Sequence, residues 1–184
     1  SIKKNVIRAK AEILKGVSTI ELTNVRYDLI NNFGKGSLVL SALGRDICSF
    51  FPEENCIAPH LEIFGNGHLN FENMKVNSGS IDIAVESPNE KYMDIKRLSA
   101  SLSLSENTLT LNNLLIKNYK AGYLDLVNKL TYDLEKKSLK DIVILKLNNF
   151  SLNTEETFYK AQGVPTLSIE TTGVLEIIQK DDLE

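Results

Sequence analysis

The stretch TLTLNNLLIKN, residues 108–118, decides which fold this sequence predicts. Its apolar residues alternate on odd positions up to Leu111 and, beyond Asn113, on even positions from Leu114. Alternation with a period of two is typical of a β-strand with one apolar face, and a slip of one residue turns that face over. Because a β-bulge or a tight bend absorbs such a slip, the stretch predicts a strand with an irregularity at Asn113.

The same pattern, apolar-x-apolar-x-Asn-apolar-x-apolar, recurs around Asn24, Asn73 and Asn149. Asparagine suits a bend because it tolerates left-handed backbone conformations and can bond to its own local backbone. We therefore interpret the chain as a degenerate repeat, in which each asparagine kinks a strand or leads from one strand into the next. A substitution of Asn113 by Val is then expected to strain the backbone.

Alternation also dominates the runs 81–85, 98–104 and 124–134. The last run has a helical alternative over 123–135, but its unbroken alternation favours a strand. Short clusters of turn-forming residues separate the runs and favour an antiparallel meander. These predicted turns include GNG at 65–67, NSGS at 77–80, SEN at 105–107 and EKKS at 135–138.

Two segments predict short helices. Residues 154–162 follow Asn153 as an N-cap and precede Gly163 as a C-terminal stop, and 43–51 is a shorter candidate. No shift in composition divides the chain, so we expect a single β-repeat domain over 1–184. The predicted fold class is mostly β: a curved antiparallel sheet, as an open β-groove or a flattened barrel or sandwich, with one or two short helices.

The composition excludes some function classes. The 184 residues carry 21 Lys and Arg against 24 Asp and Glu, a formal net charge of −3, and no Trp. We therefore expect no nucleic-acid partner. Cys48 and Cys56 form a disulfide in an oxidising compartment or stay as two thiols in a reducing one, and both alternatives are open. The only histidines are His60 and His68, and no C-x-x-C pair exists, so we expect no metal site and no cofactor.

The titratable residues do not predict an enzyme. His68, beside two glycines, is the one candidate base, and we interpret it as an exposed strand-edge histidine after a turn. Asp82 and Asp125 alternate with apolar residues, so we interpret them as the solvent face of their strands rather than as paired carboxylates. The densest basic stretch, KYMDIKR at 91–97, either meets anionic headgroups or is a solvated strand and loop.

One family resembles these repeats. The wording NTLTLNNLLIKNYKAGYLDL at 107–126, echoed by GHLNFENMKVNSGSIDI at 67–83, resembles the repeat of the AsmA-like and TamB-like envelope proteins of Gram-negative bacteria. Its style is also similar to that of the type II secretion system protein N. The resemblance implies a repeating β-groove whose concave apolar face shelters phospholipid acyl chains between the inner and outer membranes.

The resemblance also implies a place in the cell. Family members are usually longer and are anchored in the inner membrane by an N-terminal helix, with the groove in the periplasm. No segment of this chain has the ~18 consecutive apolar residues that a membrane span needs. We therefore expect the sequence, which begins at Ser1, to be a fragment or the mature part of a larger envelope protein, membrane-associated through parts not present in it.

The groove interpretation predicts that one apolar parity of the strands contacts lipid. The alternative is that these side chains pack on another sheet or a helix. The expected function is a non-enzymatic module that shelters or passes acyl chains. The alternative is a scaffold subunit of a secretion or envelope complex that contacts protein partners through its strand edges. The candidate lipid-binding residues are Leu69, Phe71, Ile81, Ile83, Leu102, Leu104, Leu109, Leu111, Leu124 and Leu126.

Overall fold

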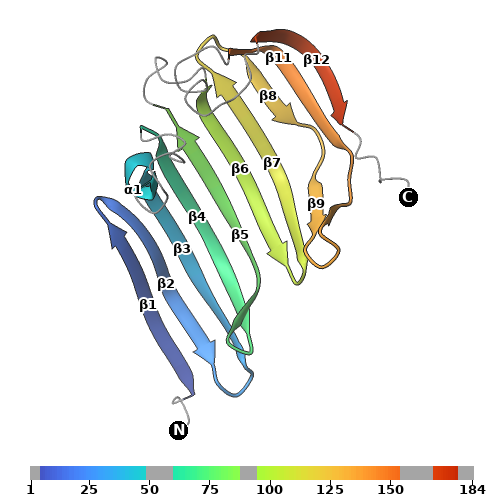
Figure 1. Cartoon of the computed structure of the whole chain (residues 1–184). Helices are drawn as coiled ribbons and strands as arrows, with labels where there is room; N and C mark the ends of the chain where they lie inside the picture. The colour runs from blue at the N-terminus through green and yellow to red at the C-terminus, as the bar shows by residue number, and fades with distance from the viewer. Residues whose placement is uncertain (1–4, 49–59, 88–94, 154–167, 178–184) are drawn as a thin grey trace.

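The computed structural model describes residues 5–48, 60–87, 95–153 and 168–177. Figure 1 shows their strands side by side in one layer, and the strands belong to one 12-stranded sheet. The one helix in the described residues is α1, Gly44–Cys48. The strands are β1 Val6–Lys15, β2 Ser18–Asp28, β3 Phe33–Leu43, β4 Glu62–Glu72, β5 Lys75–Glu86, β6 Ile95–Ser105, β7 Thr108–Asn118, β8 Tyr123–Leu126, β9 Leu130–Asp133, β10 Ser138–Leu139, β11 Val143–Asn153 and β12 Ser168–Ile177.

The sheet is an antiparallel meander, as predicted. Each strand pairs with its successor from β1 to β8, and β11 and β12 continue the order on the far side of β8. Within the described residues β1 pairs only with β2 and β12 only with β11, so the sheet does not close. The predicted open antiparallel sheet is therefore confirmed, and the predicted alternative of a closed barrel is wrong.

The asparagines at three of the four parity changes have left-handed backbones. Asn24, with φ 53°, lies at a register shift of β2, and Asn149, with φ 45°, lies at a register shift of β11. Asn73, with φ 49°, lies in the tight turn between β4 and β5. These residues confirm that the repeated asparagine either bulges a strand or leads into the next one.

The fourth parity change is built differently. The register of β6 and β7 shifts so that Asn112 is the extra residue, before the pair of Asn113 with Ser101. Asn112 donates a hydrogen bond from Nδ2 to Ser103 Oγ at 2.9 Å. Asn113 is absent from the described residues with positive φ, so the bulge is confirmed but the strain expected at Asn113 is wrong.

The alternating run 124–134 forms strands and not a helix, but it is interrupted. Strand β8 pairs with the end of β7 and β9 with its beginning, so residues 127–129 lie opposite the bulge at Asn112. The neighbouring β10 and β11 are separated at 140–142, beside the same gap. We call this line of three irregularities, at Asn112, 127–129 and 140–142, the crease.

Side chains take the place of ladder bonds along the crease. Asn128 Nδ2 donates to the Ile142 carbonyl at 2.7 Å, and Asn128 Oδ1 accepts from the Ile144 amide at 3.1 Å. Asp141 Oδ2 accepts from the Thr131 amide at 2.7 Å. These three backbone groups beside the interruption are thus satisfied locally.

Two predicted turns are wrong. The glycines of GNG at 65–67 lie in the middle of β4, and NSGS at 77–80 lies inside β5. These glycines give room to large neighbours: a Cβ on Gly65 would lie 3.2 Å from Leu40 Cβ, and one on Gly79 would lie 2.9 Å from Leu69 Cδ2. The turns predicted from SEN and EKKS are confirmed, since β7 starts directly after Asn107 and turn residues 134–137 join β9 to β10.

Helix α1 falls inside the predicted segment 43–51 and secures the first hairpin. Asp46 Oδ2 accepts from Ser18 Oγ at 2.7 Å and from the Val17 amide at 3.2 Å, in the turn that contains Gly16 with φ 60°. The hydrogen bond from Ser18 is the main cause that lowers the pKa of the Asp46 carboxyl. The helix predicted over 154–162 and the pairing of Cys48 with Cys56 lie outside the described residues.

The buried core is thin. The buried apolar residues are Tyr27, Ala42, Leu126, Leu147 and Phe150. No side chain that the structure describes is less than 2% exposed. A β-sheet buries an apolar face only against a second layer, and in the described part of the chain that layer is limited to α1. Most apolar side chains are therefore shielded only by their neighbours in the same layer.

Candidate functional site: an uncovered apolar face

The strand register gathers the apolar side chains on one side of the sheet. Directly paired residues of neighbouring strands project from the same face. One row runs from Ile81 through Leu102 and Leu111 to Leu130, each paired with the next. The bulge at Asn112 keeps Leu114, paired with Ala100, on this face although its sequence parity has changed.

All ten predicted lipid-binding residues lie on this face. Leu69, Leu104 and Leu109 follow one another through Gly79, while Leu124 and Leu126 pair with Leu147 and Leu145. The prediction missed the extension of the face to both edges, because only cross-strand pairing reveals it. The apolar face comprises the ten predicted residues together with Ile7, Ile13, Ile20, Leu22, Leu38, Leu40, Ile63, Val85, Leu98, Leu114, Ile116, Leu130, Leu139, Leu145, Leu147 and Leu175.

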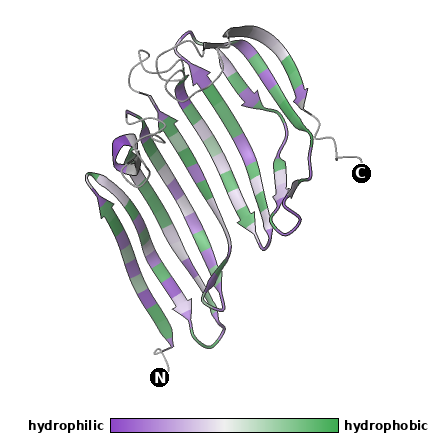
Figure 2. Cartoon of the chain, in the orientation of Figure 1, coloured by the Kyte–Doolittle hydropathy of each residue, from purple (hydrophilic) through white to green (hydrophobic). Residues whose placement is uncertain are grey.

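The apolar face is uncovered over most of its extent in the part of the chain that the structure describes, with Leu126 and Leu147 buried near its C-terminal edge. Near the edges Ile13 is 60%, Ile20 42% and Leu175 47% exposed, and the central residues are half-buried by one another. Figure 2 shows hydrophobic and hydrophilic positions alternating along the strands. Strand lengths and spacings give a face of roughly 35 by 45 Å. The alternative is that these residues pack on a second sheet, but the strands of the described residues form a single sheet.

The opposite face is mostly polar, although Phe33, Val39 and Phe64 are also exposed on it, and we call it the polar face. Ser80 pairs with His68 in β4 and with Ser103 in β6, and the His68 ring lies 3.1 Å from Ser80 Oγ. His68 is exposed but occupies the middle of an interior strand, so its predicted place at a strand edge after a turn is wrong. Asp82 and Asp125 also project from the polar face, on the separate strands β5 and β8, and do not form a carboxylate pair.

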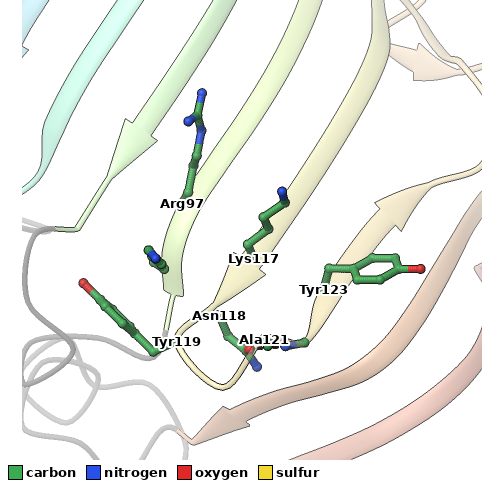
Figure 3. A pocket seen from close by; sticks show the side chains of 8 residues that line it. Arg97, Lys117, Asn118, Tyr119, Ala121 and Tyr123 are labelled. Carbon is green, nitrogen blue, oxygen red and sulfur yellow. Dashed lines mark hydrogen bonds between the residues drawn. The ribbon is translucent and has the colours of Figure 1, made fainter.

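A hollow of about 520 Å³ opens at the end of the sheet where β6 begins and β7 ends. Figure 3 shows Arg97, Lys117 and Tyr123 around it, and Arg97 and Lys117 are cross-strand partners. Arg97 Nη1 lies 3.2 Å from Glu86 Oε1. Of the basic stretch 91–97, residues 91–94 lie outside the described residues.

Buried Asn118 holds the rim of this hollow to β11. It is 3% exposed, donates from Nδ2 to Ser151 Oγ at 3.1 Å and accepts from the Gly122 amide at 2.7 Å. The bond to Ser151 joins the hairpin between β7 and β8 to β11, and the bond from Gly122 closes the turn of that hairpin.

Comparisons with known proteins assign neither a family nor a function to this chain. The chain matches no protein-family model, no curated protein and no solved structure. Within the described residues no group of three His, Cys, Asp or Glu side chains is placed to hold a metal ion. Helix α1, in the same residues, is not long and apolar enough to cross a membrane. The resemblance to AsmA-like proteins therefore stays a prediction.

Proposed function

We propose that this protein holds or passes lipid acyl chains on its apolar face, as a non-enzymatic module of a bacterial envelope. The observation that carries the proposal is an apolar face that is continuous across every long strand and uncovered in the described residues. Soluble monomers rarely expose an apolar patch of more than a few hundred Å², and larger patches mark binding surfaces. A face of this extent needs an apolar occupant.

The mechanism is passive. Each methylene that leaves water for an apolar surface gains about 0.8 kcal/mol as an upper guide, and no side chain has to ionise or react. Leu40 and Leu69 lean over Gly65 and Gly79, so hydrocarbon covers the backbone even where the strands carry glycine. An acyl chain lying across β3 to β5 would therefore meet apolar side chains on each of the three strands.

Native mass spectrometry after incubation with phosphatidylethanolamine and phosphatidylglycerol vesicles tests the proposal. The informative variant replaces the cross-strand pair Leu102 and Leu111 by asparagine, at the centre of the apolar face. The matched control replaces the cross-strand pair Ser105 and Thr108 by asparagine, on the polar face of the same two strands. Circular dichroism of each variant verifies that the sheet is retained.

We expect wild type and the control variant to carry phospholipid adducts, and the Leu102 and Leu111 variant to lose at least about tenfold in occupancy, as two leucine contacts imply. A wild-type protein that stays free of lipid contradicts the proposal. Equal occupancy in the two variants also contradicts it, because the adduct would then not depend on the apolar face.

The second candidate function is a scaffold whose edge strands pair with strands of a neighbouring molecule. The exposure of the two edge strands favours it. All residues of β1 are exposed, and β1 and β12 each pair with one strand among the described residues. The path from β1 to β12 holds ten strands, so the two edges run antiparallel and a translated copy would continue the sheet. By sequence β1 holds Arg8, Lys10, Lys15 and one Glu, whereas β12 holds two Glu and no cation. The opposite charges favour contact between unlike edges.

Sedimentation velocity over a range of concentrations tests the scaffold. The turn at Gly16 pairs Lys15 with Ser18, so the backbone of Leu14, one residue back, faces the free edge. Leu14→Pro should block strand addition there without removing a bond to β2. Higher oligomers in wild type that vanish in Leu14→Pro support the scaffold. Identical sedimentation of both proteins as monomers contradicts it.

A further inference from the structure

Three cations lie in one row across the N-terminal strands. Arg8 of β1 pairs with Arg26 of β2, and Arg26 pairs with Lys35 of β3. Lys35 in turn pairs with Asn70, which places the row on the polar face. All three cations are exposed. Like charges directly opposite one another destabilise a pair of strands, so this arrangement costs stability in the free protein.

No ion pair within the described part of the chain neutralises the row. None of its three side chains forms an ion pair there, whereas the adjacent Lys10 is held by Glu21 at 3.2 Å. The carboxylate next along β2, Asp28, accepts hydrogen bonds from the amides of Ile30 and Asn31 at 2.8 and 3.2 Å. Asp28 is thus held by its own turn, although its negative charge still lines one of the hollows beside the row.

The surface beside the row is hollowed. Two open hollows of about 610 and 570 Å³ meet there, and Arg8, Arg26 and Lys35 line both of them. One hollow extends to the bulge at Asn24, and the other extends past Asp28. The like-charged pair of Arg97 and Lys117 at the other hollow differs, since Glu86 already accompanies Arg97.

We propose that Arg8, Arg26 and Lys35 bind a phosphate anion that carries two or more negative charges, such as a phosphate monoester or inorganic pyrophosphate. Arginine presents paired N–H donors that match the oxygens of phosphate, and a lysine adds a point charge. A doubly charged anion would turn the mutual repulsion of the row into attraction. The site lies on the polar face, opposite the apolar face, so it stands or falls independently of acyl-chain binding.

Titration of the full chain with inorganic pyrophosphate at low ionic strength tests the site, with thermal unfolding and isothermal calorimetry as readouts. The variant is Arg26→Gln, at the middle of the row. The matched control is Lys146→Gln, which removes one positive charge from the same face where the cross-strand partner is Asp125. Sodium chloride of equal ionic strength separates binding from screening.

We expect pyrophosphate to raise the unfolding temperature of wild type and Lys146→Gln, and Arg26→Gln to bind at least about tenfold more weakly, as loss of a bidentate charged contact implies. Without ligand, Arg26→Gln should unfold at the same or a higher temperature, because repulsion is relieved. Equal stabilisation by chloride, or equal weakening in both variants, overturns the proposal.

Vesicles with and without phosphatidic acid distinguish the source of the phosphate. Co-sedimentation with phosphatidic acid vesicles that is lost in Arg26→Gln identifies a lipid phosphate, and pyrophosphate binding without vesicle binding identifies a soluble one. Either result supports the site. The absence of binding to both probes overturns it.

Discussion

The left-handed asparagine at the first parity change gives a sharp test of the repeat. Asn24 has φ 53° in the bulge of β2, and its side chain is exposed. A β-branched residue there keeps the same bulge only in a strained backbone, whereas glycine adopts it freely. We therefore expect Asn24→Val to destabilise the protein and Asn24→Gly to leave its stability nearly unchanged.

The size of the effect follows from the backbone. The left-handed conformation costs an L-residue about 1–2 kcal/mol, and a β-branched residue lies at the upper end. For a chain of this length 1 kcal/mol shifts the midpoint by about 2–4 °C, so Asn24→Val should unfold roughly 2–8 °C below wild type. The matched control is Asn113→Val, at the parity change where the backbone is not left-handed, and it should stay within about 0.5 kcal/mol of wild type.

Thermal unfolding followed by circular dichroism measures all three variants beside wild type. Equal losses in Asn24→Val and Asn113→Val would refute the assignment of strain to the left-handed asparagine. A loss of stability in Asn24→Gly as large as that in Asn24→Val would also refute it, because the destabilisation would then come from the missing asparagine side chain and not from backbone strain.

Three further changes probe other parts of the sheet. Asn118→Leu leaves the Gly122 amide and Ser151 without their buried partner and should cost about 2–4 kcal/mol in urea unfolding; a loss below 1 kcal/mol would contradict the role of Asn118. Gly67→Ala places a Cβ 2.3 Å from a backbone oxygen of β5 and should cost about 1–3 kcal/mol by the same assay, and an unchanged midpoint would argue against close packing there. Hydrogen bonds, first that from the Lys136 amide, lower the pKa of the Asp133 carboxyl below its usual 3.8. The stability that ionised Asp133 contributes is therefore present above pH 3.8 and is lost as the pH falls through the lower, folded pKa. Asp133→Asn should lose less unfolding free energy between pH 5 and pH 2 than wild type, as acid titration would measure.

The apolar residues of the face were predictable because their signal is local. Alternation along a single strand already separates Leu102 and Leu104 from the serines between them, and the ten predicted residues all project from one face. The parity change at Asn113 predicted a bulge, since nothing else keeps Leu111 and Leu114 on the same side. The periodicity of single strands is therefore sufficient to predict the fold class and the residues of the candidate site.

The remainder depends on pairing between strands. Glycine marks both turns and close packing, so the sequence predicts a turn at GNG, residues 65–67, although neighbouring leucines and isoleucines fill the space above those glycines. The interruption at Asn128 is hidden because an asparagine takes one place in an otherwise unbroken alternation. The cations Arg8, Arg26 and Lys35 lie far apart in the chain, and only the register of β1, β2 and β3 brings them into one row.

The crease gives the sheet an uneven stiffness. Where a long strand runs unbroken, bending across it distorts a continuous ladder of backbone bonds. Along the crease that ladder is replaced by two backbone bonds, from Val127 to Ile144 and from Lys140 to Thr131, and by the side chains of Asn128 and Asp141. We therefore expect the sheet to bend most easily along that line. Because β9 stays paired with β7 and β10 with β9, such bending would move Leu130 and Leu139 together, and it would widen or narrow the apolar surface without unfolding any of the long strands.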